Sequence, residues 1–270
     1  MKYLLKKHLP PRLVHYLTYL SNWNHNLYSI NSNVCLKNNL SDFFIWSKNC
    51  SKIEFIAENL RALISGEEVE IIHHFKFFSE DGKLISLQKY KSNAYFEKIT
   101  LEPIKQESNY SSFTHFVESE ISLNDILNKY LKNTKNICEH NRGYTIYYPS
   151  KENAGSIAHG NFGGISKNDA KNAITHFKKH IYTPIYMFND SENYDLVFNN
   201  PTKNRIRIKL ILNNNGNLKF IEIPSLGTRF FNINNYSGSI SFESKLPICR
   251  PLVFKNPAPN FTGTFDVFHS

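Results

Sequence analysis

The chain has 270 residues, a formal net charge of +9 at pH 7 and a hydrophobic fraction of 41%. This length and apolar content exclude a disordered chain and allow one large domain or two of ordinary size. Lysine supplies most of the positive charge and is spread along the chain without a recognition motif, so we expect no specific nucleic acid partner. No run of about 18 apolar residues occurs, and we therefore expect no transmembrane segment.

Residues 1–40 predict an N-terminal helix followed by a loop. Apolar residues at helical spacing follow Pro10 and Pro11, and the next stretch is rich in Asn and Ser. The first apolar run is broken at Lys6 and Lys7, which argues against a secretory signal. The cysteines are widely spaced and form no CxxC pair, so we expect free thiols and a cytoplasmic protein.

Residues 41–120 predict a first β unit, and residues 121–140 a helical linker. Apolar runs typical of strands cover 41–46 and 71–78. A helix is expected from Ser122 to Asn133, because Ser122 can cap its N-terminus before a stripe of apolar residues.

Residues 141–270 predict a second β unit. Its clearest element runs from Arg205 to Leu212, where charged and apolar residues alternate as in a half-buried strand. An Asn-rich turn ending at Gly216 leads into the apolar run 218–223, which completes a hairpin. No alternation of strands and helices is present, so the fold class is mainly β, with two sandwich-like units and one or two short helices.

The two β units share short patterns that suggest an internal duplication. The run 54–59 is similar to 195–200, and Gly82 follows its strand much as Gly216 does. Any two hairpins with glycine turns share such features, and duplication and coincidence are evenly matched as explanations.

The segment 155–164 has the most unusual local composition, with His159 and Asn161 between glycines. Glycines let a ligand approach the backbone closely, and glycine loops can bind phosphate through backbone amides. The segment matches no nucleotide-binding motif, and a strand followed by a glycine turn is the competing interpretation.

Two arginines, Arg142 and Arg250, lie among apolar strand residues. A guanidinium in such surroundings needs a carboxylate or an anionic ligand. We predict a ligand-binding site formed by five residues drawn from these unusual stretches: His159, Asn161, Arg250, His269 and Arg142. Trp46 or Tyr147 could add a ring for stacking against a sugar.

Metal binding has weaker support. His176 and His180 are four residues apart and would share a helix face, but Phe177 stands where a zinc protease has its catalytic Glu. We expect no metal and no cofactor.

These observations favour a non-catalytic cytoplasmic protein that binds a carbohydrate or another small polar ligand. One alternative is an enzyme acting on glycans or phosphorylated sugars, with His159 or His269 as acid or base and Arg250 as an anion clamp. Another is a module that binds a protein partner through an exposed sheet edge.

Overall fold

The computed structural model describes residues 39–130, 139–149, 154–167, 169, 175, 179–213, 218–246, 250–257 and 264–269. The helix predicted near the N-terminus lies outside these residues, as does His176. His180 begins a strand, so the helix predicted to carry both histidines does not reach it.

The described chain is mainly β, as predicted, and its strands form four sheets. The first half contains β1 (Leu40–Ser47), β2 (Lys52–Glu58), α4 (Leu60–Ser65), β3 (Ile71–Phe78), β4 (Leu84–Ser92), β5 (Phe96–Thr100), β6 (Tyr110–Glu118) and α5 (Leu123–Tyr130). After α5 come β7 (His140–Asn141), β8 (Tyr144–Tyr148), β9 (Ser156–His159) and β10 (Asn161–Ser166). The second half contains β11 (His180–Tyr182), β12 (Tyr194–Asn199), β13 (Ile206–Leu212), β14 (Leu218–Ile223), β15 (Thr228–Ile233), β16 (Ile240–Ser244), β17 (Leu252–Lys255) and β18 (Asp266–His269).

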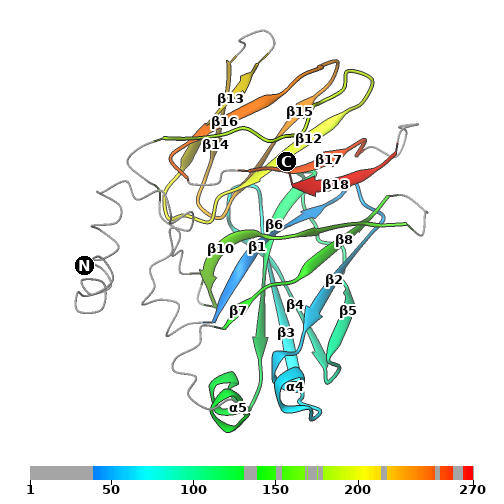
Figure 1. The fold of residues 1–270 in the computed structure, drawn as a ribbon, viewed down its shortest axis with the longest axis vertical. Helices are drawn as coiled ribbons and strands as arrows, with labels where there is room; N and C mark the ends of the chain where they lie inside the picture. The colour runs from blue at the N-terminus through cyan, green and yellow to red at the C-terminus, as the bar shows by residue number, and fades with distance from the viewer. Residues whose placement is uncertain are drawn as a thin grey trace, which may run out of the picture.

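Each half is a two-sheet sandwich. The first packs the sheet β10-β1-β6-β3-β4, with β7 paired to β1, against the sheet β5-β2-β8-β9. The second packs β11-β16-β13-β14 against β15-β12-β17-β18. In Figure 1 the second sandwich, coloured yellow to red, lies at the opposite end of the first from α4 and α5.

The strand orders of the two sandwiches correspond. Eight strands of the first half (β1 to β6, β8 and β9) have the same pairing partners as β11 to β18, taken in sequence order. An internal duplication would produce this equivalence, and the duplication itself stays a prediction.

The strands between residues 140 and 166 pair with strands of the first sandwich, which differs from the predicted division of the chain. The sequence predicts them in the second β unit, but β7 and β10 pair with β1, and β8 pairs with β2. The boundary predicted at the linker helix is too early in the chain, because β8 and β9, which complete the sheet around β2, follow that helix. The helix α4 was not predicted; Asn59 caps its N-terminus and Gly66 ends it in a left-handed conformation.

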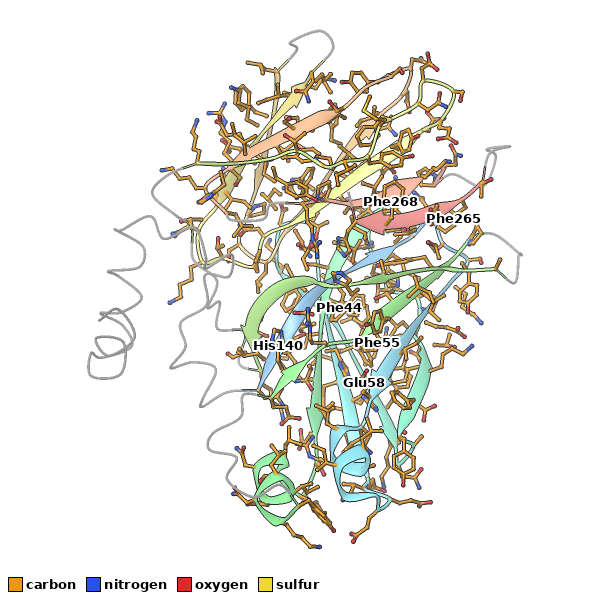
Figure 2. All side chains as sticks on the ribbon, in the orientation of Figure 1. Phe44, Phe55, Glu58, His140, Phe265 and Phe268 are labelled. Atoms are coloured by element: carbon orange, nitrogen blue, oxygen red, sulfur yellow. The ribbon has the colours of Figure 1, made fainter. Side chains whose placement is uncertain are left out.

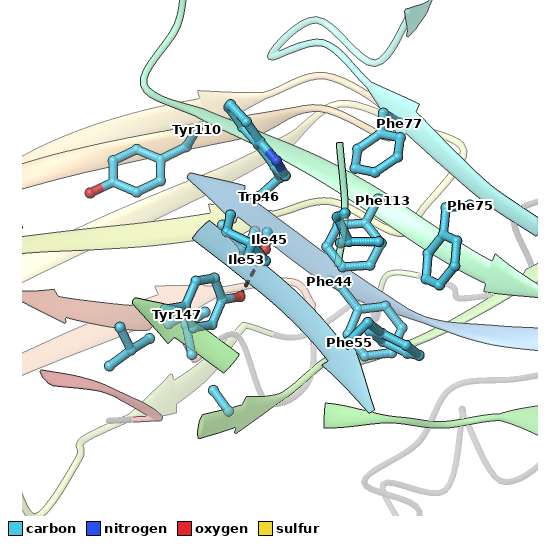
Figure 3. Close-up of a cluster of buried hydrophobic side chains, with 14 of the residues drawn as sticks. Phe44, Ile45, Trp46, Ile53, Phe55, Phe75, Phe77, Tyr110, Phe113 and Tyr147 are labelled. Atoms are coloured by element: carbon cyan, nitrogen blue, oxygen red, sulfur yellow. Dashed lines mark hydrogen bonds between the residues drawn. The ribbon is translucent and has the colours of Figure 1, made fainter. Parts of the chain in front are cut away.

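The two sandwiches share apolar contacts. Phe44, Phe55 and Phe113 belong to the first core, and the sheet β15-β12-β17-β18 adds Val197 and Phe254 to the same cluster. Figure 3 shows the aromatic rings of this core between β1 and its neighbours. Because side chains alternate along a strand, β12 and β17 direct their other faces into the second core, and these two strands are buried on both sides.

Polar contacts also join the halves. Tyr110 on β6 donates a hydrogen bond to Asp195 on β12, at 2.6 Å, and Asn232 donates a second to the same carboxylate, at 2.7 Å. Burial raises the pKa of Asp195, and burial together with that carboxylate raises the pKa of Tyr110. This buried network fixes β12 against β6.

Candidate functional site

The candidate site lies at the junction of the two sandwiches, where β9 runs beside β18. The Ser156 hydroxyl donates to Asp266 Oδ1 at 2.6 Å, and the Val267 amide donates back to Ser156 Oγ at 2.9 Å. These bonds align the starts of the two strands, and the other ends then bring His159 next to His269. Figure 1 shows β18 in red at the edge of the second sandwich that is nearest the first.

Three of the five predicted site residues meet at this junction. The imidazole rings of His159 and His269 have centroids 4.2 Å apart and are tilted by 32°. Arg250 lies two residues before β17, and one of its guanidinium nitrogens is 3.5 Å from His159 Nε2. Residues 91 and 110 positions after His159 in the sequence thus contact it in the fold.

Hydrogen bonding fixes the tautomers of both rings. Only a protonated ring nitrogen can donate to a carbonyl, so His159 Nδ1 donates to the Gly160 carbonyl at 2.8 Å. By the same reasoning, His269 Nε2 donates to the His159 carbonyl at 2.8 Å. The lone pair of His159 then faces Arg250, and the lone pair of His269 is on Nδ1.

Among the described residues, the site has a guanidinium without a carboxylate partner and a ring nitrogen without a hydrogen-bond partner. Burial, followed by the positive charge of Arg250, lowers the pKa of His269 to about 3, so this ring is neutral at pH 7. Its Nδ1 is buried and has no hydrogen-bond partner in the part of the chain that the structure describes. Among the described residues, Arg250 forms no ion pair with a carboxylate. The site therefore offers a positively charged set of N–H donors beside a neutral acceptor.

The other two predicted residues make contacts elsewhere. Asn161 donates its amide N–H to Asn199 Oδ1 at 3.0 Å, and Asn199 in turn donates to the Phe43 carbonyl. This chain of amides connects β10, β12 and β1. Arg142 pairs with Asp42 at 3.2 Å, and its side chain is 67% exposed.

Arg142 lines a cavity of about 190 Å³ in the first sandwich, formed by residues of β2, α4, β6 and β7 and their flanks. Its other polar members include Arg61, which forms a two-pronged ion pair with Glu139. His140 Nε2 lies 2.8 Å from the buried Asp42 carboxylate. Figure 2 labels His140 and Glu58, two residues of this cavity. Sequence reasoning missed Asp42 and His140, since neither is in a motif and only the parallel pairing of β7 with β1 brings them together.

The aromatic residues proposed for sugar stacking do not reach the site. Trp46 and Tyr147 are buried in the first core, and Tyr147 donates its hydroxyl to the Ile45 carbonyl at 2.8 Å (Figure 3). The glycines around His159 also serve packing. A Cβ atom on Gly160 would lie 2.7 Å from the Phe44 ring, which is closer than side chains tolerate. These residues allow the strands to pack closely instead of forming a phosphate loop.

Comparisons with known proteins add no family. No family model matches the chain, and no curated protein matches it. A solved structure of a mutant of Bacillus subtilis oxalate decarboxylase aligns with 80% of this chain and 68% of its own length, at 6% identity and a TM-score of 0.15. That score is too low for any conclusion to be drawn from the likeness.

Two further features concern metals and membranes. In the described ranges, no group of three His, Cys, Asp or Glu side chains is arranged to hold a metal ion. Neither described helix has the length and apolar character needed to cross a bilayer.

Proposed function

We propose that the protein is a non-catalytic binding protein for a carbohydrate or another small polar ligand, held at the junction of the two sandwiches. The observation that carries this proposal is the guanidinium of Arg250, which lies against His159 without a carboxylate among the described residues. An arginine in such a position is stabilised by an anionic group from a ligand.

The site chemistry narrows the ligand. The N–H donors of Arg250 suit a carboxylate or a phosphate, which a guanidinium can bind through two parallel hydrogen bonds. His269 Nδ1 can accept a hydrogen bond and is buried without a partner among the residues described, so it suits a hydroxyl group. A sugar acid or a sugar phosphate carries both kinds of group.

Binding is favoured over catalysis by the state of the histidines. A general acid or base works best when its pKa is near the working pH, and the pKa of His269 is lowered to about 3. His159 already uses both ring nitrogens, one toward Gly160 and one toward Arg250. The enzyme alternative therefore depends on ligand binding rearranging both rings.

We also propose the cytoplasm as the compartment. Burial raises the pKa of the free Cys50 thiol to about 12, which makes that side chain unreactive at neutral pH. It behaves as a packing residue and not as half of a disulfide.

Thermal unfolding with three sugars tests the proposal: glucose, glucuronate and glucose 6-phosphate. A ligand present at about 100 times its dissociation constant adds roughly 2.7 kcal/mol to the free energy of unfolding. We expect at least one anionic sugar to raise the unfolding midpoint of the wild type but not of Arg250→Gln. The matched control is Lys91→Gln, which removes one charge from an exposed pair with Glu70. Equal shifts in all three proteins, or no shift with any of the sugars, would contradict the proposal.

A further inference from the structure

A second groove lies on the outer face of the second sandwich, away from the junction site. It has a volume of about 430 Å³ and is formed mainly by β13, β14 and β16. Figure 1 shows these strands at the end of the molecule farthest from α4 and α5. Its volume is within the range of small-molecule sites.

The groove is strongly basic. Five of its lining residues are cations: Lys179, Arg205, Arg207, Lys209 and Lys245. Two of the five are neutralised, since Lys179 pairs with Glu243 at 2.7 Å and Arg205 with Glu222 at 3.3 Å. The other three form no ion pair with a described carboxylate. A surface with such an excess of one charge attracts ions of opposite charge.

Strand geometry sets the spacing of these cations. Arg205 precedes β13, and Arg207 and Lys209 follow on the outward positions of that strand. Alternate residues of a strand are about 7 Å apart, so the row from Arg205 to Lys209 extends over about 13 Å. Arg207 and Lys209, the two cations of the row without an ion pair to a described carboxylate, are about 7 Å apart along the strand, a spacing that suits one phosphate group at each.

An aromatic ring completes the groove. Phe220 faces Lys209 across the β13–β14 ladder, and its side chain is exposed. The Arg207 guanidinium lies 4.1 Å from the Phe220 ring centroid, and this contact orients its N–H groups. The exposed ring also offers an apolar contact for the organic part of a ligand.

We propose that this groove binds a small organic anion carrying at least two phosphate groups. Arg207 and Lys209 provide the main phosphate contacts, and Phe220 contacts the organic part. The groove is separate from the Arg250 site, so either site can be present without the other.

Calorimetric titration with inorganic pyrophosphate, at low and at physiological salt, tests the inference. We expect binding that weakens as salt screens the charges, and a loss of about tenfold in affinity for Lys209→Gln and for Arg207→Gln. The matched control is Lys219→Gln, because Lys219 is the neighbour of Phe220 on β14 and points to the opposite face of the strand. Its affinity should change less than about twofold.

Lys209→Gln and Arg207→Gln are both measured, so that the test still holds if one of them folds poorly. The unfolding midpoint of each variant shows whether it is folded. Absence of pyrophosphate binding at low salt overturns the inference. An equal loss in Lys219→Gln overturns it as well, since net charge alone would then explain the binding. Tighter binding of a single-stranded oligonucleotide than of pyrophosphate in the same groove overturns the choice of a small anion.

Discussion

The outward faces of β3 and β13 differ in how their cations are neutralised, although the two strands occupy the same place in their sandwiches. On β3, His74 lies 3.0 Å from Glu118 and Lys76 lies 2.9 Å from Asp169. On β13, Arg207 and Lys209 form no ion pair with a described carboxylate, and Glu243, which lies opposite Lys209 on β16, pairs with Lys179.

Exposure differs in the same direction. The side chains of His74 and Lys76 are 14% and 18% exposed, whereas on β13 Arg207 is exposed and Lys209 is partly exposed. In the first half, the charged side chains on the outward face of the sheet form ion pairs with carboxylates and are largely covered. In the second half it remains available to solvent, and this is the reason for placing the anion groove there.

The largest expected effect concerns the joint between the halves. Gly82, in the β3–β4 turn, has a φ of +78°, and a Cβ atom there would collide with the Ser225 carbonyl oxygen of the second half. Gly82→Ala should therefore lower the free energy of unfolding by about 3 kcal/mol or more, measured by chemical denaturation.

Gly66→Ala is its matched control. Gly66 has a φ of +71° but no atom close to the position of a Cβ, so only backbone strain of about 1 kcal/mol is expected. Similar losses in the two variants would show that the turn does not hold the halves together.

A smaller effect is expected at the buried hydrogen bonds across the joint. Tyr110→Phe leaves the Asp195 carboxylate with Asn232 as its remaining side-chain donor, which should cost about 2 kcal/mol of unfolding free energy. Tyr236→Phe removes a hydroxyl that donates to the Ser239 carbonyl within the second half, and about 1 kcal/mol is expected. A greater loss of unfolding free energy in Tyr236→Phe than in Tyr110→Phe would show that the hydrogen bonds between the halves are not the more stabilising ones.

The pH dependence of stability provides a test at the junction site. An unfolded histidine binds a proton below about pH 6.5, whereas folded His269 stays neutral down to about 3. Between these values the unfolded state binds more protons, so the free energy of unfolding falls as the pH falls. For His269→Gln we expect this slope to be shallower by about 1 kcal/mol per pH unit, measured by denaturation between pH 4 and pH 6. An unchanged slope would mean that His269 is not kept neutral.

The smallest expected effects compare the two outward faces directly. Lys76→Gln breaks the pair with Asp169 and should lower the free energy of unfolding by about 0.5 kcal/mol. Lys209→Gln should leave it unchanged or slightly raise it, because repulsion among the groove cations decreases. A larger loss in Lys209→Gln would show that its charge stabilises the fold.

Much of the strand content could be predicted from the sequence. Alternation along 205–212 and the apolar runs 71–78 and 218–223 correspond to β13, β3 and β14. The alternation of polar and apolar residues along a strand shows which face is buried, and it can be read from neighbouring residues alone. The division between the units depends on contacts between residues far apart in the sequence, since the partners of β8 and β10 lie near residue 50.

The site was predictable only in part. The signal was a polar residue in a stretch of unusual composition, glycine-rich around His159 and apolar around Arg250, and the fold brings these two residues together with His269. The same signal also selected Asn161 and Arg142, which make contacts within the fold. A sequence shows that a polar residue is in an unusual stretch. Only the strand pairing shows whether another residue of the protein satisfies that polar group or whether it is left for a ligand. The groove was missed because its cations were read as the solvated face of a strand.

Nitrogen-15 NMR of the histidine rings tests the junction site most directly. At pH 7 we predict a neutral His269 ring with its proton on Nε2, and a proton on Nδ1 of His159. Glucose 6-phosphate should shift the unprotonated Nδ1 resonance of His269 in the wild type and leave it unchanged in Arg250→Gln. A charged His269 at pH 7, or the same shift in both proteins, would contradict the account.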